Sequence, residues 1–250
     1  MNKLPQVTLL FWVMKICATT LGETGGDMLS MTLNIGYAAS TILLLSIFVV
    51  TLVAQLRSRH YHPTLYWLVI LSTSTAGTTM SDFMDRSLGL GYALGSSLLA
   101  GLLCAVLLYW KWSEKSIAMT DIRSFKSEFL YWSAILVSNT LGTALGDYLA
   151  DSSGLGFAGG AALIGGSIAL IALAYYVTSI STVVLFWIAF VLTRPLGATM
   201  GDLMTKPLSS GGFNLGTYGS SAVLFAILAA TIVYSQWHLG RNPRRLASTS

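Results

Sequence analysis

Long apolar segments alternate with short polar connections along the chain, and eight of the segments have the length of a membrane-spanning helix. A helix of about 20 predominantly apolar residues is long enough to cross the hydrocarbon core of a bilayer. The segments lie at residues 8–29, 37–56, 64–84, 91–111, 130–150, 157–177, 183–204 and 216–237. The pattern predicts an all-α, polytopic membrane protein with eight transmembrane helices in a single membrane domain, residues 1–250.

A seven-residue motif recurs four times, and each copy ends on an aspartate inside one of these segments. The copies read LGETGGD, AGTTMSD, LGTALGD and LGATMGD, and they end at Asp27, Asp82, Asp147 and Asp202. A glycine lies five residues before each aspartate. Fifteen residues before each aspartate is a tryptophan: Trp12, Trp67, Trp132 and Trp187. A carboxylate in hydrocarbon is costly, so four acids in register predict one polar site built by repetition.

Each motif belongs to a repeat of two segments joined by a glycine-containing turn, which predicts a helical hairpin. The repeats cover residues 8–56, 64–111, 130–177 and 183–237. Because every repeat begins on the same side of the membrane, the four are parallel and should surround an axis along the membrane normal. The interval between the second and third motif aspartates is longer than the other two intervals. The additional residues fall in a linker, residues 112–128, between two four-helix halves. Its mixed charge predicts a solvated cytoplasmic linker; a short interfacial helix or a regulatory contact are the alternatives.

The distribution of charge is that of a membrane protein. Charged residues make up 10% of the chain, whereas soluble domains contain about 25%. Ten loop and terminal cations fall on the side that holds both termini, and only Arg86 and Lys206 fall on the other. This bias predicts that both termini are cytoplasmic. Since the cations are dispersed among separate loops, the net charge of +4 reflects topology, and no nucleic-acid partner is predicted.

A polar stripe runs along the first, third, fifth and seventh segments. Side chains four residues apart share a helix face, and stepping back from each aspartate in fours gives polar side chains at eleven of twelve positions. The stripe comprises Thr19, Glu23, Asp27, Ser74, Thr78, Asp82, Asn139, Thr143, Asp147, Arg194 and Asp202, with Lys15 one turn deeper. Polar groups avoid lipid. The odd segments should therefore form an inner ring, and the even segments a lipid-facing wall.

The depth of the site follows from helix geometry. From tryptophan to aspartate is about 22 Å of helix. If the tryptophans mark the inner interface, the aspartates lie near the outer edge of the hydrocarbon core. Glycines beside the aspartates, such as Gly26 and Gly146, allow either close helix approach or a break in the helix.

The stripe supplies oxygen ligands for a hard cation. Carboxylate oxygens suit Mg, Ca or Mn, whereas softer metals prefer Cys or His. The expected metal ligands or proton carriers are Asp27, Asp82, Asp147, Asp202 and Glu23; Thr19, Ser74, Thr78, Asn139 and Thr143 are auxiliary, and Lys15 and Arg194 are counter-charges. Neighbouring carboxylates can titrate as a coupled pair. We therefore expect a secondary transporter of a manganese-like divalent cation, coupled to protons, with no cofactor. Membrane lipid and the ion are the expected partners, and a homo-oligomer is compatible with the sequence.

Other functions use the same residues differently. Arg194 and Lys15 could hold the carboxylate of a small organic anion, the ring could form a cation channel, or its charges could only hold the bundle together. At the rim, Asp85, Asp151 and Lys206 are expected to have a structural or turn role. An enzyme is not predicted, because the sequence has no Ser/His/Asp or Cys/His arrangement and no HExxH motif.

With these motifs the chain resembles a family of bacterial integral membrane proteins defined by a two-helix repeat of unknown function, present four times. The resemblance covers Leu9 to Trp237 and implies a location in the bacterial inner membrane. Repeat two departs from the motif with Ser81, and repeat four with Arg194-Pro195. The segment ETGGD is weakly similar to the E-x-G-D signature of a cation-exchanger family that moves manganese and calcium. The spacing of its acids differs, so the similarity serves as an analogy.

Overall fold

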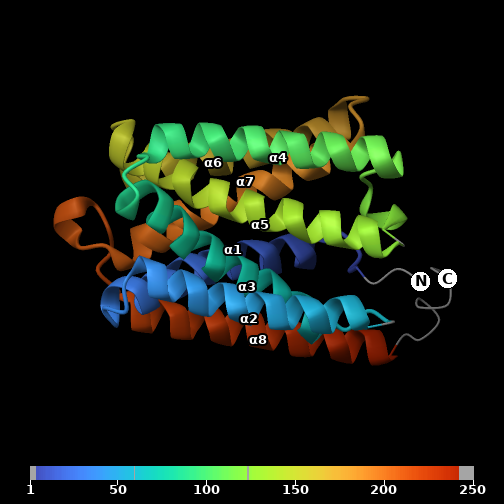
Figure 1. Cartoon of the computed structure of the whole chain (residues 1–250), viewed down its shortest axis with the longest axis horizontal. Coiled ribbons are helices and arrows are strands. Elements are labelled where there is room, and N and C mark those ends of the chain that lie inside the picture. Colours follow the sequence, from blue (N-terminus) through green and yellow to red (C-terminus); the bar gives the residue numbers. More distant parts are fainter. Residues whose placement is uncertain (1–3, 59, 123, 242–250) are drawn as a thin grey trace.

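The protein is all-helical in the computed structural model, which describes residues 4–58, 60–122 and 124–241, without the side chains of 238–241. No strand occurs in these ranges (Figure 1). The eight long helices are α1 (Leu9–Asp27), α2 (Tyr37–Arg57), α3 (Pro63–Asp82), α4 (Tyr92–Glu114), α5 (Phe125–Asp147), α6 (Gly156–Val177), α7 (Thr182–Thr205) and α8 (Thr217–Arg241). Each coincides closely with one predicted segment.

Several helices have the length and composition of membrane spans. In the described part of the chain, α2, α4, α6, α7 and α8 are long and apolar enough to cross a bilayer. Helices α1, α3 and α5 are of similar length but carry more polar residues, because the polar stripe lies on them. The protein therefore has the character of a helical membrane protein.

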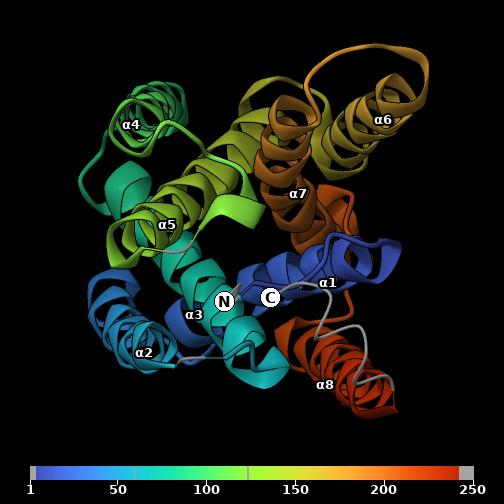
Figure 2. The ribbon, with the colours of Figure 1, turned by 90° about the vertical axis from the view of Figure 1, so that its right-hand side faces the viewer.

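The four odd-numbered helices form a closed inner ring. Viewed along the bundle, α1, α3, α5 and α7 are neighbours in that order, and α7 packs on α1 to close the ring (Figure 2). Their side chains are mostly buried, whereas α2, α4, α6 and α8 lie outside them and are mostly exposed. This is the arrangement that the polar stripe predicts.

The outer helices are displaced by one repeat. Helix α2 packs on α3, α4 on α5, α6 on α7, and α8 on α1, while the two helices of one repeat make few contacts with each other. The expectation of four self-contained hairpins is therefore wrong. The connection at the aspartate end of each repeat carries the chain sideways, so each outer helix covers the inner helix of the next repeat.

These sideways connections share one backbone conformation. Each ends with a pair of positive-φ residues two positions apart: Asn34 and Gly36, Gly89 and Gly91, Gly154 and Gly156, Asn214 and Gly216. Glycine and, less often, asparagine adopt this region at low cost. Before the turn, α1, α3 and α5 continue past their aspartates into a π-helical turn of five residues. The inner helices are thus continuous at their glycines, and not broken there.

The connection between the two halves is shorter and more buried than predicted. Helix α4 ends at Glu114 and α5 begins at Phe125, with only a three-residue 3-10 turn, Met119–Asp121, between them. Met119 and Ile122 are buried in the core. The Trp187 indole also donates a hydrogen bond of 3.0 Å to the Ile117 carbonyl. This segment joins the two halves and packs in part against one end of the bundle, while Thr120 and Asp121 are exposed.

The repeated tryptophans lie inside that same end, which we call the aromatic end. Trp67, Trp132 and Trp187 are at most 4% exposed, and Trp12 is partly buried, so these rings pack within the bundle. Their expected depth at the inner interface stays a prediction. Each of the four repeated tryptophans packs against an aromatic ring of the previous repeat. That ring belongs to the residue directly before the tryptophan of that repeat. The four ring pairs, with centroid separations of 5.6–6.2 Å, are Phe11–Trp67, Tyr66–Trp132, Tyr131–Trp187 and Phe186–Trp12. Such pairs favour tight packing, and this aromatic collar closes the bundle opposite the aspartates.

Candidate functional site

The glycines of the motif bring the inner helices into direct contact. Each motif glycine faces a residue on the neighbouring inner helix, eight positions before the motif aspartate of that helix. A Cβ added to the glycine would overlap this residue. These pairs are Gly22 with Ser74, Gly77 with Asn139, Gly142 with Arg194 and Gly197 with Thr19. The motif is thus a small-residue packing motif of the kind that membrane helices use. Because the helices approach so closely, their polar stripes meet along the axis.

All four aspartates are buried at one end of the ring, the aspartate end, and are between 2% and 4% exposed. They divide into two pairs, each bridged by one cation. Arg86 forms ion pairs with Asp82 on its own helix, at 3.0 Å, and with Asp147 on α5, at 3.1 Å. It also donates a hydrogen bond to the Tyr37 hydroxyl. This cation therefore joins α3 to α5.

Lys206 makes the corresponding bridge on the opposite side. Its ammonium lies 3.1 Å from Asp202, four residues earlier, and 3.1 Å from Asp27 on α1. Burial alone would lower the pKa of Lys206, but Asp27 and Asp202 raise it above its usual value. Lys206, which follows the end of α7, therefore carries its charge at neutral pH.

Arg194 occupies the centre of the ring below the aspartates. It is fully buried, and its guanidinium forms an ion pair of 3.1 Å with Glu23. The same guanidinium donates hydrogen bonds to groups on three other helices: the carbonyls of Thr19 and Ser74 and the hydroxyls of Thr78 and Thr143. One side chain from α7 thereby connects α1, α3 and α5 in a single network.

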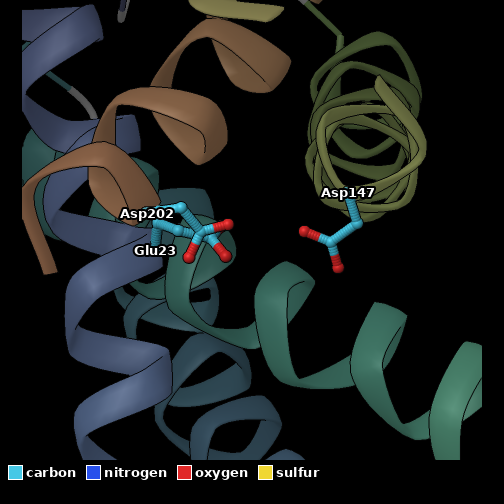
Figure 3. A group of neighbouring side chains, drawn as sticks. All are labelled: Glu23, Asp147 and Asp202. Atoms are coloured by element: carbon cyan, nitrogen blue, oxygen red, sulfur yellow. The ribbon is translucent and has the colours of Figure 1, made fainter. Parts of the chain in front are cut away.

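Three carboxylates converge from different helices. Glu23, Asp147 and Asp202 each offer an oxygen atom, and these oxygens lie within 4.8 Å of one another. Figure 3 shows Glu23 and Asp202 side by side, with Asp147 opposite them. We call these residues the carboxylate triad. Oxygen ligands at this separation are suited to a hard divalent cation such as Mn²⁺, Mg²⁺ or Ca²⁺.

The structure brings together only part of the predicted ligand set. Asp27 and Asp82 lie outside the triad and face Lys206 and Arg86. Of the auxiliary residues, Thr78 and Thr143 donate hydrogen bonds to Glu23, at 3.2 and 3.1 Å.

The other auxiliary residues lie one turn deeper. The Thr19 hydroxyl donates to the carbonyl of Thr193, and the Asn139 amide donates to the Thr73 hydroxyl. The Ser74 hydroxyl has no hydrogen-bond partner among the described residues. The backbone carbonyls of Thr19 and Ser74 accept hydrogen bonds from Arg194, and among the described residues no hydrogen bond joins these three side chains to the triad.

Lys15 does not act as a direct counter-charge in this structure. Its side chain is fully buried, and its ammonium lies 4.1 Å from the centroid of the Phe190 ring. Within the described ranges the ammonium has no hydrogen-bond partner and no carboxylate in ion-pair distance. Lys15 points instead to the apolar layer next to the aromatic collar, and its role as a counter-charge stays a prediction.

A cavity of about 410 Å³ lies at the aspartate end beside the cluster. Its charged and polar lining includes Arg86, Lys206, Asp202, Asp151 and Tyr92. The two bridging cations are partly exposed, with 30% and 25% of their side chains accessible. Arg86 and Lys206 thus lie between this cavity and the buried carboxylates.

These two cations make contacts beyond the ones that their spacing predicts. The sequence indicates that cations on the stripe could neutralise surplus carboxylates, and a structural or turn role at the rim was expected for Lys206. The available signal was their spacing, because each lies four residues after a motif aspartate and therefore on the same helix face. The sequence pattern does not indicate that each cation also contacts an aspartate on the neighbouring helix.

Comparison with known proteins identifies the repeat. A family model described as Repeat of Unknown Function (DUF347) matches four times, at residues 10–61, 65–116, 130–181 and 185–238. These matches cover most of the chain and coincide with the four structural repeats. No curated protein and no solved structure matches the chain.

Proposed function

The chain belongs to the family defined by this repeat of unknown function, and from that premise we propose that it is a secondary transporter of a divalent, manganese-like cation, coupled to protons. In this proposal all eight helices span the bacterial inner membrane. Both termini are cytoplasmic, so the aspartate end faces the periplasm and the aromatic collar closes the cytoplasmic side. The chain catalyses no reaction, and the cation is its substrate.

The observation that carries the proposal is the carboxylate triad of Glu23, Asp147 and Asp202, with oxygens within 4.8 Å of one another inside the helix ring. Three such ligands from three helices can replace much of the hydration shell of a hard cation. One member of the triad, Asp202, also lines the cavity at the aspartate end. An ion held by the triad would contact both halves of the chain.

The balance of charge supports the same conclusion. When ionised, the four aspartates and Glu23 carry five negative charges, and the contacting cations Arg86, Arg194 and Lys206 carry three positive ones. Two negative charges are left over, which one divalent cation or two protons would neutralise. Because ligand carboxylates must be deprotonated to bind a metal, binding and protonation compete. This competition provides the proposed coupling to protons.

Calorimetric titration of the purified protein with Mn²⁺, Ca²⁺, Mg²⁺ and Zn²⁺ tests the assignment. We expect one of the hard cations to bind, with an affinity that falls between pH 7.5 and pH 5.5. Asp147→Asn removes one negatively charged ligand and should weaken binding at least tenfold. The matched control is Asp151→Asn, four residues later on the same helix, whose side chain is exposed. Binding that is equal in the two variants, or that is absent from the parent protein, would refute the assignment.

A small organic anion is the second candidate, and the cavity at the aspartate end favours it. Arg86, Lys206 and the Tyr92 hydroxyl line this cavity and could hold a carboxylate. In that case an organic acid would bind in metal-free buffer, and Lys206→Met would abolish its binding. Metal titration would give no signal. The same purified protein therefore separates the two candidates.

A further inference from the structure

The two cation bridges are equivalent to each other under a twofold relation between the halves of the chain. Asp27 and Asp82 in the first half correspond to Asp147 and Asp202, 120 residues later in each case. The same shift takes Arg86 to Lys206. It converts the bridge Asp82–Arg86–Asp147 into the bridge Asp202–Lys206–Asp27. We call these two bridges the clasps.

Both clasps lie where the two halves of the chain meet. The first half contributes α1 and α3 to the inner ring, and the second half contributes α5 and α7. One clasp joins α3 to α5, and the other joins the end of α7 to α1. Among the described residues, no ion pair joins α1 to α3 or α5 to α7. The position four residues after the aspartate is Met31 in repeat one and Asp151 in repeat three, so these repeats have no clasp cation.

The clasps are built so that they can open. The side chains of Arg86 and Lys206 are partly exposed, so water can solvate them when they leave the aspartates. Both line the cavity of about 410 Å³, which gives them room to withdraw. Arg86 already has alternative contacts there, because it donates to the Tyr37 hydroxyl at 3.2 Å and lies 5.8 Å from the Tyr92 ring.

The carboxylate triad takes one acid from each clasp. Asp147 belongs to the Arg86 clasp and Asp202 to the Lys206 clasp, while Glu23 lies between them. A cation bound to the triad therefore competes with Arg86 and with Lys206 at the same time. Each of these carboxylates would then attract two cations, the bound ion and the clasp cation, and these two repel each other. Occupancy of the triad therefore weakens both clasps together.

We propose that the two clasps form an ion-sensitive lock between the halves of the chain, and that one divalent cation at the triad releases both. The release of the lock rests on the proposed function, whereas the existence of the lock does not. Halves that are related by an axis along the membrane normal and that rock against each other are one known arrangement of transporters. In this protein the lock holds the connections at the aspartate end together until the ion arrives, while Arg194 joins the helices below it.

Distances between spin labels on the connections at the aspartate end test the lock in the full-length protein. Cys17 and Cys104 are first replaced by alanine. Labels at the exposed positions 88 and 155 then report on the α3–α5 seam, and labels at 33 and 208 on the α7–α1 seam. A pair at 33 and 88 lies within the first half and serves as the control. Pulsed electron spin resonance gives each distance in metal-free buffer.

In the double variant Arg86→Gln/Lys206→Gln, both seam distances should lengthen while the control distance stays constant. Each single variant should affect its own seam, which keeps the test valid if the double variant does not fold. The exchange Arg86→Lys/Lys206→Arg preserves both charges and should keep the parent distances. Seam distances that do not change in any glutamine variant would overturn the lock.

Adding Ca²⁺, a diamagnetic hard cation, to the parent protein tests the release. Both seam distances should lengthen together, and Glu23→Gln, which removes a triad ligand that belongs to neither clasp, should suppress the change. If calorimetry shows that Ca²⁺ binds and the distances remain constant, the release mechanism is wrong. If no metal binds but the glutamine variants still open the seams, the lock is correct and the metal-transport function is wrong.

Discussion

Replacing Arg194 with methionine should strongly destabilise the protein. The guanidinium holds Glu23 at 3.1 Å and also bonds to α1, α3 and α5. Methionine fills a similar volume but leaves Glu23 as an unpaired carboxylate in the interior. Breaking a buried ion pair in this way costs about 3–5 kcal/mol, a large share of a total stability of about 5–15 kcal/mol. The yield of monodisperse protein in detergent and its Tm measure the effect.

Two further variants make this result specific. The double variant Glu23→Gln/Arg194→Met removes both charges, and it should recover much of the lost stability because no unpaired ion remains. Arg57→Met changes an exposed cation at the end of α2 and should leave Tm nearly unchanged. If Arg194→Met is as stable as Arg57→Met, the central network does not hold the ring together.

The eight helices and the inner ring could be predicted because both depend on local pattern. A run of about 20 apolar residues forms a helix in lipid whatever its neighbours are. A polar stripe such as Thr19, Glu23 and Asp27 must face other protein, because lipid cannot satisfy it. These two constraints place four helices inside and four outside without any knowledge of how they contact one another.

The displacement of the outer helices could not be predicted. Helix α2 presents apolar side chains, and such a surface packs equally well against α1 or α3, so its partner is set by the backbone of the connection. The left-handed residues of that connection, such as Asn34 and Gly36, are visible in the sequence. The direction in which they send the chain depends on the π-helical turn before them, for which the sequence has no clear signal.

The sequence predicts only one of the two contacts that each bridging cation makes. The spacing from Asp82 to Arg86 indicates one shared face, but the contact with Asp147 depends on how α3 and α5 are rotated. The packing of the tryptophans had a signal of its own. In every repeat the tryptophan follows Phe or Tyr, as in Tyr66-Trp67. This pairing was the available signal for a packed aromatic layer.

Replacing Gly197 with alanine should separate α7 from α1 and destabilise the ring. An added Cβ would lie 2.7 Å from the Cβ of Thr19 and 2.8 Å from its backbone carbonyl carbon. A backbone atom cannot move aside as a flexible side chain does, so the whole helix must shift. Overpacking of this kind costs about 1–3 kcal/mol. The shift would also stretch the contact between Arg194 and Glu23, which crosses the same seam, and Tm should fall accordingly.

Gly166→Ala is the matched control, because an added Cβ at Gly166 in α6 would meet no atom within 4 Å. Alanine is a better helix former than glycine by about 1 kcal/mol, so this variant should be neutral or slightly more stable. A lower Tm for Gly197→Ala together with an equal or higher Tm for Gly166→Ala is expected only if the motif glycines act through close helix contact. Equal destabilisation at both positions would mean that glycine is required for backbone flexibility instead, and the inner helices would then have to bend during function.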